Sequence, residues 1–257
     1  MRLGGVRAIA LNTFREAIRD KILYLLVVFG LVLIGAARII SWLTVGAQIK
    51  IIVDVGLAAI TIFGVLVAVF IGISLVQREI ERRTIYTVVT KPIHRHEFIL
   101  GKFAGLALTL LVMLFVMSAL LQVAVFLKTG HASLPVLRAC FLIYFELLVI
   151  VSIAILFSSF STPILSFLLT LMLYVIGHLS YSLLDLAKHL PAGAGPFVLK
   201  VVYYVLPNLE NFNLKAAAVH GLPVPTGFVL TSIEYGLVYV AAILTLSVIV
   251  FRTRDFT

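Results

Sequence analysis

The sequence predicts an all-α protein that crosses a membrane several times, and three observations lead to that fold class. Hydrophobic residues make up 62% of the 257 residues, and charged residues only 12%. A chain of this composition has too little polar surface to enclose a soluble globule, so most of it must lie in lipid. The third observation is a series of apolar runs, each close to the ~20 residues with which a helix crosses the hydrocarbon core.

The first expected element is an amphipathic elbow helix over residues 1–21, lying in the membrane interface. On a helical projection Val6 and Phe14 fall on one side, and Arg15 and Glu16 fall on the other. A helix with one apolar and one charged face binds at the boundary between headgroups and acyl chains.

Six transmembrane helices are then expected. By residue number they are 22–40, 53–76, 103–127, 139–158, 163–184 and 228–251. Lys and Arg gather before the first span, in the loop after the second, and after the last. Because basic residues favour the cytoplasmic side, both termini are expected in the cytoplasm, and an even number of spans agrees with this topology.

The segment 77–98 is the one long charged stretch between two strongly apolar ones. Its first part predicts a short amphipathic helix, which Lys91-Pro92 ends. A solvated basic loop is the alternative, but such a loop has no need of the run TIYTVV. An apolar face ringed by charges predicts that a soluble partner docks on this helix. The residues expected to make that coupling contact are Glu79, Ile80, Glu81, Arg82, Arg83, Ile85, Val88 and Val89.

A long outer segment, residues 185–227, precedes the last span. Two apolar stretches split by Pro207-Asn208 predict short helices that enter the outer leaflet or cover a pathway. Its histidines, His189 and His220, lack the paired spacing of metal ligands, so we expect no metal there.

Ionisable residues within the expected spans are candidates for a transport pathway, because a charge at mid-bilayer costs about 3 kcal/mol. Counting ~1.5 Å per residue places Glu146, His178 and Glu234 at a similar depth, roughly 9 to 10 Å below the outer surface. Asp54 would lie nearer the surface. One interpretation is a polar lining of the path or a proton-linked group. The other is a buried group that fixes packing, such as a neutral Glu146 against His178 or a tyrosine.

Small residues recur at four-residue spacing in two places. Gly64, Ala68 and Gly72 lie in the second expected span, and Gly101 and Gly105 lie at the entry to the third. Such spacing lets helix backbones approach closely in lipid, so it favours helix contacts at both places.

The residues do not indicate an enzyme. The nearest candidate for a phosphate-binding loop, Gly101-Lys102, lacks the upstream glycine and the following hydroxyl residue. We therefore expect no ATP hydrolysis and no bound cofactor in this chain. The basic residues lie in short segments beside the spans rather than along one face, which indicates topology and lipid contacts rather than nucleic-acid binding.

Three segments carry a family resemblance: LNTFREAIRDKILY before the first span, EIERRTIYTVVTKPIHRHEFILGKFAG after the second, and FRTRDF at the end. They are similar to the membrane subunits of type-2 class ABC exporters, and most of all to the branch of permeases described as involved in multi-copper enzyme maturation. The resemblance implies one domain over residues 1–257, in the cytoplasmic membrane of a bacterium or archaeon. It also implies a homodimer bound to two copies of a cytoplasmic ATPase, which holds ATP and Mg, with segment 77–98 as the coupling helix.

Two other functions stay open at this point. An ion-coupled secondary transporter would use Glu146 and Glu234 as coupling sites, although the halves 1–127 and 128–257 show no evident internal repeat. A membrane scaffold for the maturation of another protein would transport nothing. The identity of a cargo does not follow from a fold that permits many.

Overall fold

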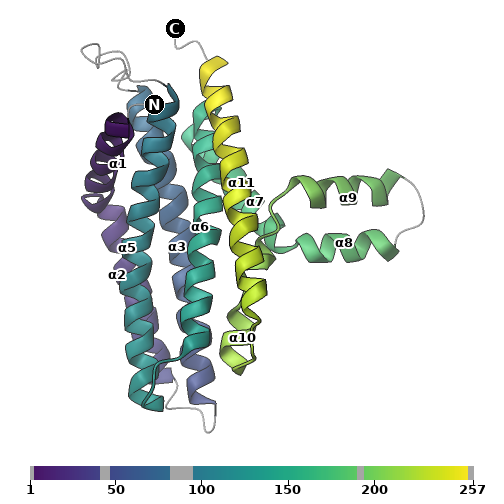
Figure 1. The fold of residues 1–257 in the computed structure, drawn as a ribbon. Coiled ribbons are helices and arrows are strands. Elements are labelled where there is room, and N and C mark those ends of the chain that lie inside the picture. The colour runs from purple at the N-terminus through teal and green to yellow at the C-terminus, as the bar shows by residue number, and fades with distance from the viewer. Residues whose placement is uncertain (1–2, 41–46, 82–94, 190–193, 254–257) are drawn as a thin grey trace.

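The computed structural model describes residues 3–40, 47–81, 95–189 and 194–253, which form helices and connecting turns with no strand among them. The all-α prediction is confirmed for these residues. In chain order the helices are α1 (Leu3–Ile18), α2 (Lys21–Ile40), α3 (Gln48–Glu81), α5 (Arg95–Thr129), α6 (Leu134–Phe160), α7 (Pro163–His178), α8 (Ser180–His189), α9 (Ala194–Val205), the 3₁₀ turn η2 (Leu209–Phe212), α10 (Lys215–His220) and α11 (Thr226–Thr253) (Figure 1).

Four of the described helices are long and apolar enough to cross a membrane. These stretches are Gln48–Ser74, His96–Thr129, Leu134–Phe160 and Thr226–Phe251. A fifth results if α7 and α8 together form one broken span. The first expected span coincides with α2, of which Leu26–Ala37 is a shorter apolar stretch. Four to five spans are therefore supported, and the count of six stays a prediction.

Two of the long helices continue beyond the predicted spans. Helix α3 reaches Glu81 rather than Val76, and α5 begins at Arg95 rather than at Phe103. A helix satisfies its own backbone hydrogen bonds, so it does not have to end where the apolar residues end. Segment 77–98 thus starts as the last turn of α3 and finishes as the first turn of α5, and residues 82–94 lie outside the described part of the chain.

The fifth expected span is not one straight helix over residues 163–184. Helix α7 ends at His178, and α8 leaves it at an angle of 58°. The side chain of Ser180 donates a hydrogen bond to the carbonyl of Gly177 at 2.8 Å, which satisfies one of the carbonyls that the ending helix leaves open. Figure 1 shows α8 and α9 projecting from the bundle as a hairpin. Hydropathy averaged over a whole span does not reveal this bend, because α7 and α8 together are still apolar enough to pass for one span.

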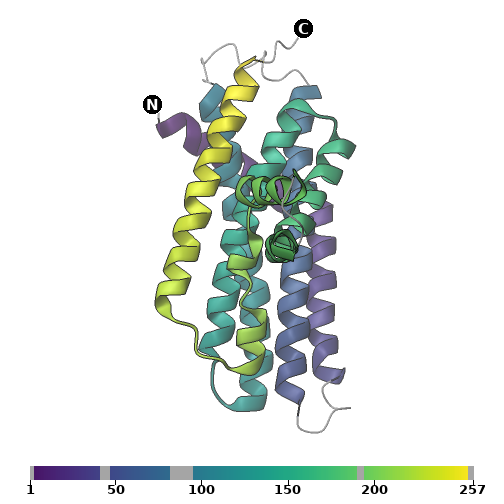
Figure 2. The ribbon, with the colours of Figure 1, turned by 90° about the vertical axis from the view of Figure 1, so that its right-hand side faces the viewer.

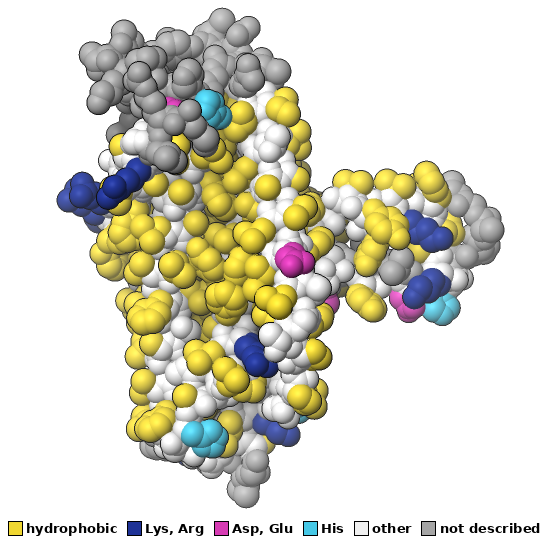
Figure 3. All heavy atoms as spheres, in the orientation of Figure 1, with side chains coloured by type: hydrophobic (Ala, Val, Ile, Leu, Met, Phe, Trp, Pro, Cys, Tyr) yellow, Lys and Arg dark blue, Asp and Glu magenta, His cyan; other side chains and the backbone are white. Residues whose placement is uncertain are grey.

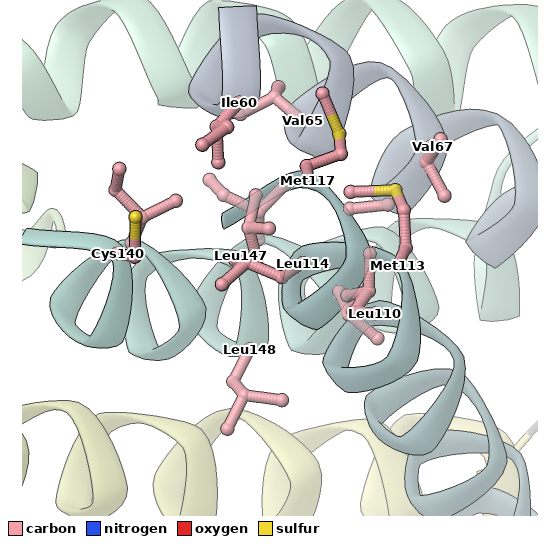
Figure 4. Close-up of a cluster of buried hydrophobic side chains, with 14 of the residues drawn as sticks. Ile60, Val65, Val67, Leu110, Met113, Leu114, Met117, Cys140, Leu147 and Leu148 are labelled. Atoms are coloured by element: carbon pink, nitrogen blue, oxygen red, sulfur yellow. The ribbon is translucent and has the colours of Figure 1, made fainter. Parts of the chain in front are cut away.

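Helix α6 lies at the centre of the bundle, in contact with α3, α5, α7 and α11. Its residues from Glu146 to Leu156 are all buried. Figure 4 shows how apolar side chains from three helices meet there, with Ile60 of α3, Met117 of α5 and Leu147 of α6 in one cluster. This packing fixes the helix that carries the polar site described below.

The small-residue pattern on α3 lies at its contact with α6. A Cβ atom added at Gly64 would lie 2.7 Å from Cδ1 of Leu147, and one added at Gly72 would lie 3.5 Å from Cβ of Ala154. The helices therefore approach each other where side chains are absent, as expected for packing in lipid.

The second small-residue pattern receives the amphipathic helix α1. A Cβ atom at Gly101 would lie 2.6 Å from Cβ of Ile9, and one at Gly105 would lie 2.6 Å from the carbonyl oxygen of Ala10. Helix α1 thus rests directly on the backbone of α5. Its position in a membrane interface stays a prediction.

The start of α1 and the end of α11, which bound the described part of the chain, lie at one end of the bundle, which we call the α1 end. Helix α1, the last turn of α3, the first turn of α5 and the last turn of α11 all lie there, and α10 lies at the opposite, α10 end (Figure 1). Figure 2 looks at the hairpin end-on and shows the chain running from it to α10, before α11 returns to the α1 end. Hydrophobic side chains cover most of the face formed by α5 and α11 (Figure 3), which suits contact with lipid.

Candidate functional site

A polar cluster with one buried member joins α6, α7 and η2. Glu146, in the middle of α6, is only 1% exposed, and its Oε1 lies 2.9 Å from Nε2 of His178, the last residue of α7. The other ring nitrogen of His178, Nδ1, lies 3.5 Å from Oε2 of Glu210 in η2. The imidazole therefore lies between two carboxyl groups from different elements. We call Glu146, His178 and Glu210 the carboxylate bridge.

The charges of the carboxylate bridge follow from its geometry. An imidazolium carries a proton on each nitrogen and can donate to both Glu146 and Glu210. A neutral ring donates only once, so one of the two carboxyl groups must then carry the second proton. In both arrangements the bridge compensates Glu146, whose isolated charge would be strongly unfavourable inside the bundle.

Glu210 is held in place by its neighbours in η2. The side chain of Asn208 accepts a hydrogen bond from the backbone N–H of Glu210 at 3.2 Å, as residues before a helical turn commonly do. The amide of Asn213 donates to Oε1 of Glu210 at 2.9 Å. The two oxygens of this carboxyl thus have different partners, since Oε1 faces Asn213 and Oε2 faces His178.

Residues 207–214, which we call the wedge, enter the bundle beside the carboxylate bridge. Leu209 and Phe212 are both 0% exposed. A Cβ atom at Gly177 would lie 2.7 Å from Cγ of Leu209, and one at Gly236 would lie 3.0 Å from Cζ of Phe212. Two glycines, one on α7 and one on α11, therefore provide the space that the wedge fills.

Hydrogen bonds also connect the wedge to α11. The backbone N–H of Asn208 donates to the hydroxyl of Tyr235 at 2.8 Å, and the hydroxyl of Ser232 donates to the carbonyl of Asn211 at 2.9 Å. Together with the carboxylate bridge, these bonds attach the wedge to α6, α7 and α11.

The structure brings together two of the three residues predicted to share a layer, Glu146 and His178. Glu234 takes no part in the carboxylate bridge and is exposed on α11, and Asp54 is exposed on α3. Sequence reasoning missed Glu210, because depth was counted only along the expected spans. The available signal was the order Pro207, Asn208, Glu210, in which an N-cap residue follows a helix breaker.

The predicted ATPase-coupling residues lie at the end of α3 and beyond it. Helix α3 is fixed there by Gln77, whose side-chain amide donates to the carbonyls of Ser158 at 3.2 Å and Ser161 at 2.7 Å. Its last three residues are Glu79, Ile80 and Glu81. The other coupling residues lie outside the described part of the chain, and they are Arg82, Arg83, Ile85, Val88 and Val89.

A buried lysine adds a charge contact between α1 and α5. Lys102 is 0% exposed, and its Nζ lies 3.9 Å from Oε2 of Glu16 and 5.8 Å from the ring centre of Phe98. It lies next to Gly101, which contacts α1 through Ile9. Helix α1 is therefore attached to the first turns of α5 by both packing and charge.

Metal ligation is not indicated by the described side chains. Among them, no group of three His, Cys, Asp or Glu residues is arranged to hold a metal ion. In the carboxylate bridge the imidazole ring lies between the two carboxyl groups, so its three side chains face one another rather than a shared centre.

The long apolar helices, with polar side chains gathered at their contacts, define a multi-pass helical membrane protein. Residues 7–256 match the family model described as ABC-2 family transporter protein, and the chain belongs to this family. None of the curated proteins compared with the chain matches it. As a family member the chain is the permease subunit of an ABC transporter, a membrane component that is not itself catalytic and that associates with an ABC ATPase.

Proposed function

We propose that this permease forms the substrate path of an ATP-driven exporter as a homodimer, and that two copies of a separate cytoplasmic ATPase drive it. Family membership supports the permease role and the ATPase partner. ATP and Mg²⁺ bind to that ATPase. The six-span topology has both termini in the cytoplasm, so the α1 end of the bundle faces the ATPase. The resemblance to the multi-copper maturation branch favours the cytoplasmic membrane of a bacterium or archaeon.

The length of α3 and α5 is the observation that carries the proposal. Their apolar spans are Gln48–Ser74 and His96–Thr129, and α3 continues past its span to Glu81. Residues 82–94 are therefore connected to two helices, each about 50 Å long at 1.5 Å per residue. Both helices pack along α6, so a displacement of the coupling segment is passed along the whole bundle.

Helix α1 strengthens this connection. Its contact with Gly101 and Gly105, together with the pairing of Glu16 and Lys102, makes α1 and the start of α5 one unit. Closure of the ATPase pair would push on segment 77–98 and move this unit with it. The rearranged helices would then change access to the path between the two copies of the chain.

Substitution of the apolar face of segment 77–98 tests the proposal. Replacing both Ile85 and Val88 with Asp should remove the docking face, so that co-purification with the ATPase falls by about tenfold or more. The amount of chain in the membrane fraction should stay unchanged. The matched control is Ile85→Val with Val88→Ile, which keeps the face apolar. If the Asp double variant co-purifies with as much ATPase as the control variant does, this segment is not the coupling element.

A further inference from the structure

We infer that a groove between α5 and α11 holds one acyl chain of a membrane phospholipid, which comes from the leaflet at the α1 end. Leu100 of α5 lines one side of this groove, and a stripe of α11 from Leu237 to Val248 lines the other. The volume of the groove is about 400 Å³, within the ~300–1,000 Å³ of sites that bind small organic ligands.

The groove exists because two helices meet at one end and then diverge. The rings of Phe98 on α5 and Phe251 on α11 stack at the α1 end, with 5.7 Å between their centres. From there α5 and α11 separate toward the α10 end (Figure 1). The lining residues of α11 recur every three or four positions, which is the spacing of a helix face that packs against a neighbour. Among the described residues of α5, Leu100 alone lines this face, so most of it is left for another occupant.

The lining of the groove selects an apolar occupant. Its polar residue is Thr245, whose hydroxyl donates to the carbonyl of Ala241 one turn earlier at 2.8 Å. Ala241 and Thr245 are both exposed, and because they are small they leave the groove open. A polar group placed there would lose its water without gaining a hydrogen-bond partner. The groove opens on the hydrophobic face of α5 and α11 (Figure 3), which is the surface that meets lipid.

The depth of the groove corresponds to one leaflet. The apolar span of α5 begins at His96 and that of α11 ends at Phe251, which marks the membrane boundary at the α1 end. The α11 stripe starts three residues inside this boundary, at Val248, and runs over eleven residues to Leu237. At 1.5 Å per residue this is about 16 Å, against ~15 Å for half of the hydrocarbon core. The groove thus runs from just below the headgroups to the middle of the membrane, as an acyl chain does.

A transmembrane helix from a second copy of the chain fits the groove less well. A helix of the same length and ~10 Å diameter occupies roughly 1,300 Å³, so a groove of about 400 Å³ would hold only a minor part of it. The stacked rings of Phe98 and Phe251 also close the α1 end, and a helix that spans the membrane would have to cross them. An extended hydrocarbon chain is one methylene wide, and its carbon contacts of ~4 Å suit a long and narrow space.

The charges at the α1 end suit the phosphate of such a lipid. Helix α1 rests on α5 and exposes Arg7 and Arg15. Figure 3 shows basic side chains over α1, beside the apolar face of α5 and α11. They attract a phosphate at this end of the groove over about one Debye length, ~8–10 Å. The basic groups thus favour a lipid whose headgroup lies at the α1 end, and the groove holds its chain.

A count of retained lipids tests the inference. Protein is extracted with detergent from vesicles of phosphatidylethanolamine and phosphatidylglycerol, and native mass spectrometry counts the phospholipids that stay bound. Ala241→Phe places a ring in the groove and should cause the loss of one bound phospholipid per chain. Ala242→Phe is the matched control, because it makes the same change at the next position, which is exposed and outside the lining. Equal lipid counts in the two variants would overturn the inference.

The same spectra distinguish a lipid from a second copy of the chain. If Ala241→Phe turns dimers into monomers and leaves the lipid count unchanged, the groove is a contact between copies and the inference is wrong. Native Cys140, which is buried in α6, reports on folding. Its slow labelling by a maleimide should be the same in Ala241→Phe and in the parent protein, because the ring enters open space. Fast labelling would mean that the groove has no room for a ring, which also contradicts the inference.

Brominated phospholipids test the direction of the chain in the groove. Leu237→Trp and Val248→Trp place a fluorescent reporter at each end of the stripe, in a Trp42→Phe background that removes the single native tryptophan. With retained lipid in detergent, bromines near the end of the acyl chain should quench Leu237→Trp about twofold more than Val248→Trp, because the two positions differ in depth by about one leaflet. Bromines near the headgroup should give the opposite order. Equal quenching at both positions, or the reversed order, would contradict a chain that enters from the α1 end.

Discussion

The two ends of the bundle combine close packing and polar contacts in different proportions. At the α1 end, α1 lies against the bare backbone of α5 at Gly101 and Gly105. At the α10 end, the wedge is held by the carboxylate bridge and by hydrogen bonds from Tyr235 and Ser232. Each end also uses the other kind of contact, since Glu16 pairs with Lys102 at the α1 end and Leu209 packs on Gly177 at the α10 end.

This difference matters because helices in lipid gain little from hydrophobic burial, so packing and polar contacts hold them together. Separated packing surfaces exchange close contacts between backbones for contacts with lipid chains. Separated polar groups can bind water instead. Both ends therefore depend on close approach at glycine residues, and the α10 end depends more on polar contacts.

The largest expected effect comes from removing the centre of the carboxylate bridge. His178→Leu leaves Glu146 buried without its partner, which should lower the free energy of unfolding by about 3–5 kcal/mol. Thermal unfolding of the detergent-solubilised protein measures it, with the reactivity of the buried Cys140 as the native reporter.

The matching double variant, Glu146→Leu with His178→Leu, removes the buried charge as well and should recover most of the loss. A double variant that is less stable than His178→Leu alone would contradict the bridge as the source of the effect. Such a result would place the stabilisation in the packing of the ring against Tyr174.

The sequence predicts the α1 end better than the α10 end, for a physical reason. Apolar runs locate the long helices, and the spacing of Gly101 and Gly105 predicts a close contact without naming its partner. The position of Glu210, in contrast, depends on a chain that turns back into the bundle. Depth counted along a continuous helix contains no information about such a turn. The bend after His178 is also missed, because α7 and α8 together are still apolar enough to pass for one span.

The second largest expected effect concerns the contact between α1 and α5. A Cβ atom at Gly105 would lie 2.5 Å from Cβ of Thr13 and 2.6 Å from the carbonyl of Ala10, so Gly105→Leu must push α1 away from α5. Overpacking of this kind should cost about 1–3 kcal/mol of unfolding free energy. Gly35→Leu is the matched control, because no atom lies within 4 Å of a Cβ there. A similar loss in both variants would show that α1 is not held by close approach.

The smallest expected effect concerns Glu234, a carboxyl group on α11 that is exposed, whereas Glu146 is enclosed. Glu234→Gln should change the unfolding free energy by no more than ~0.5 kcal/mol, as exposed substitutions generally do. Glu146→Gln, which weakens a charged hydrogen bond to His178, should lower it by about 1.5–3 kcal/mol.

ATP hydrolysis by the assembled complex distinguishes the two roles that Glu234 could have. If Glu234 lines the path between two copies of the chain, Glu234→Gln should lower hydrolysis by the complex while stability stays the same. If it only faces the lipid headgroups and water, both quantities should match the parent protein. A stability loss as large as that of Glu146→Gln would mean that Glu234 is enclosed in the assembled dimer, and that the face of α11 with Glu234 is a contact between copies.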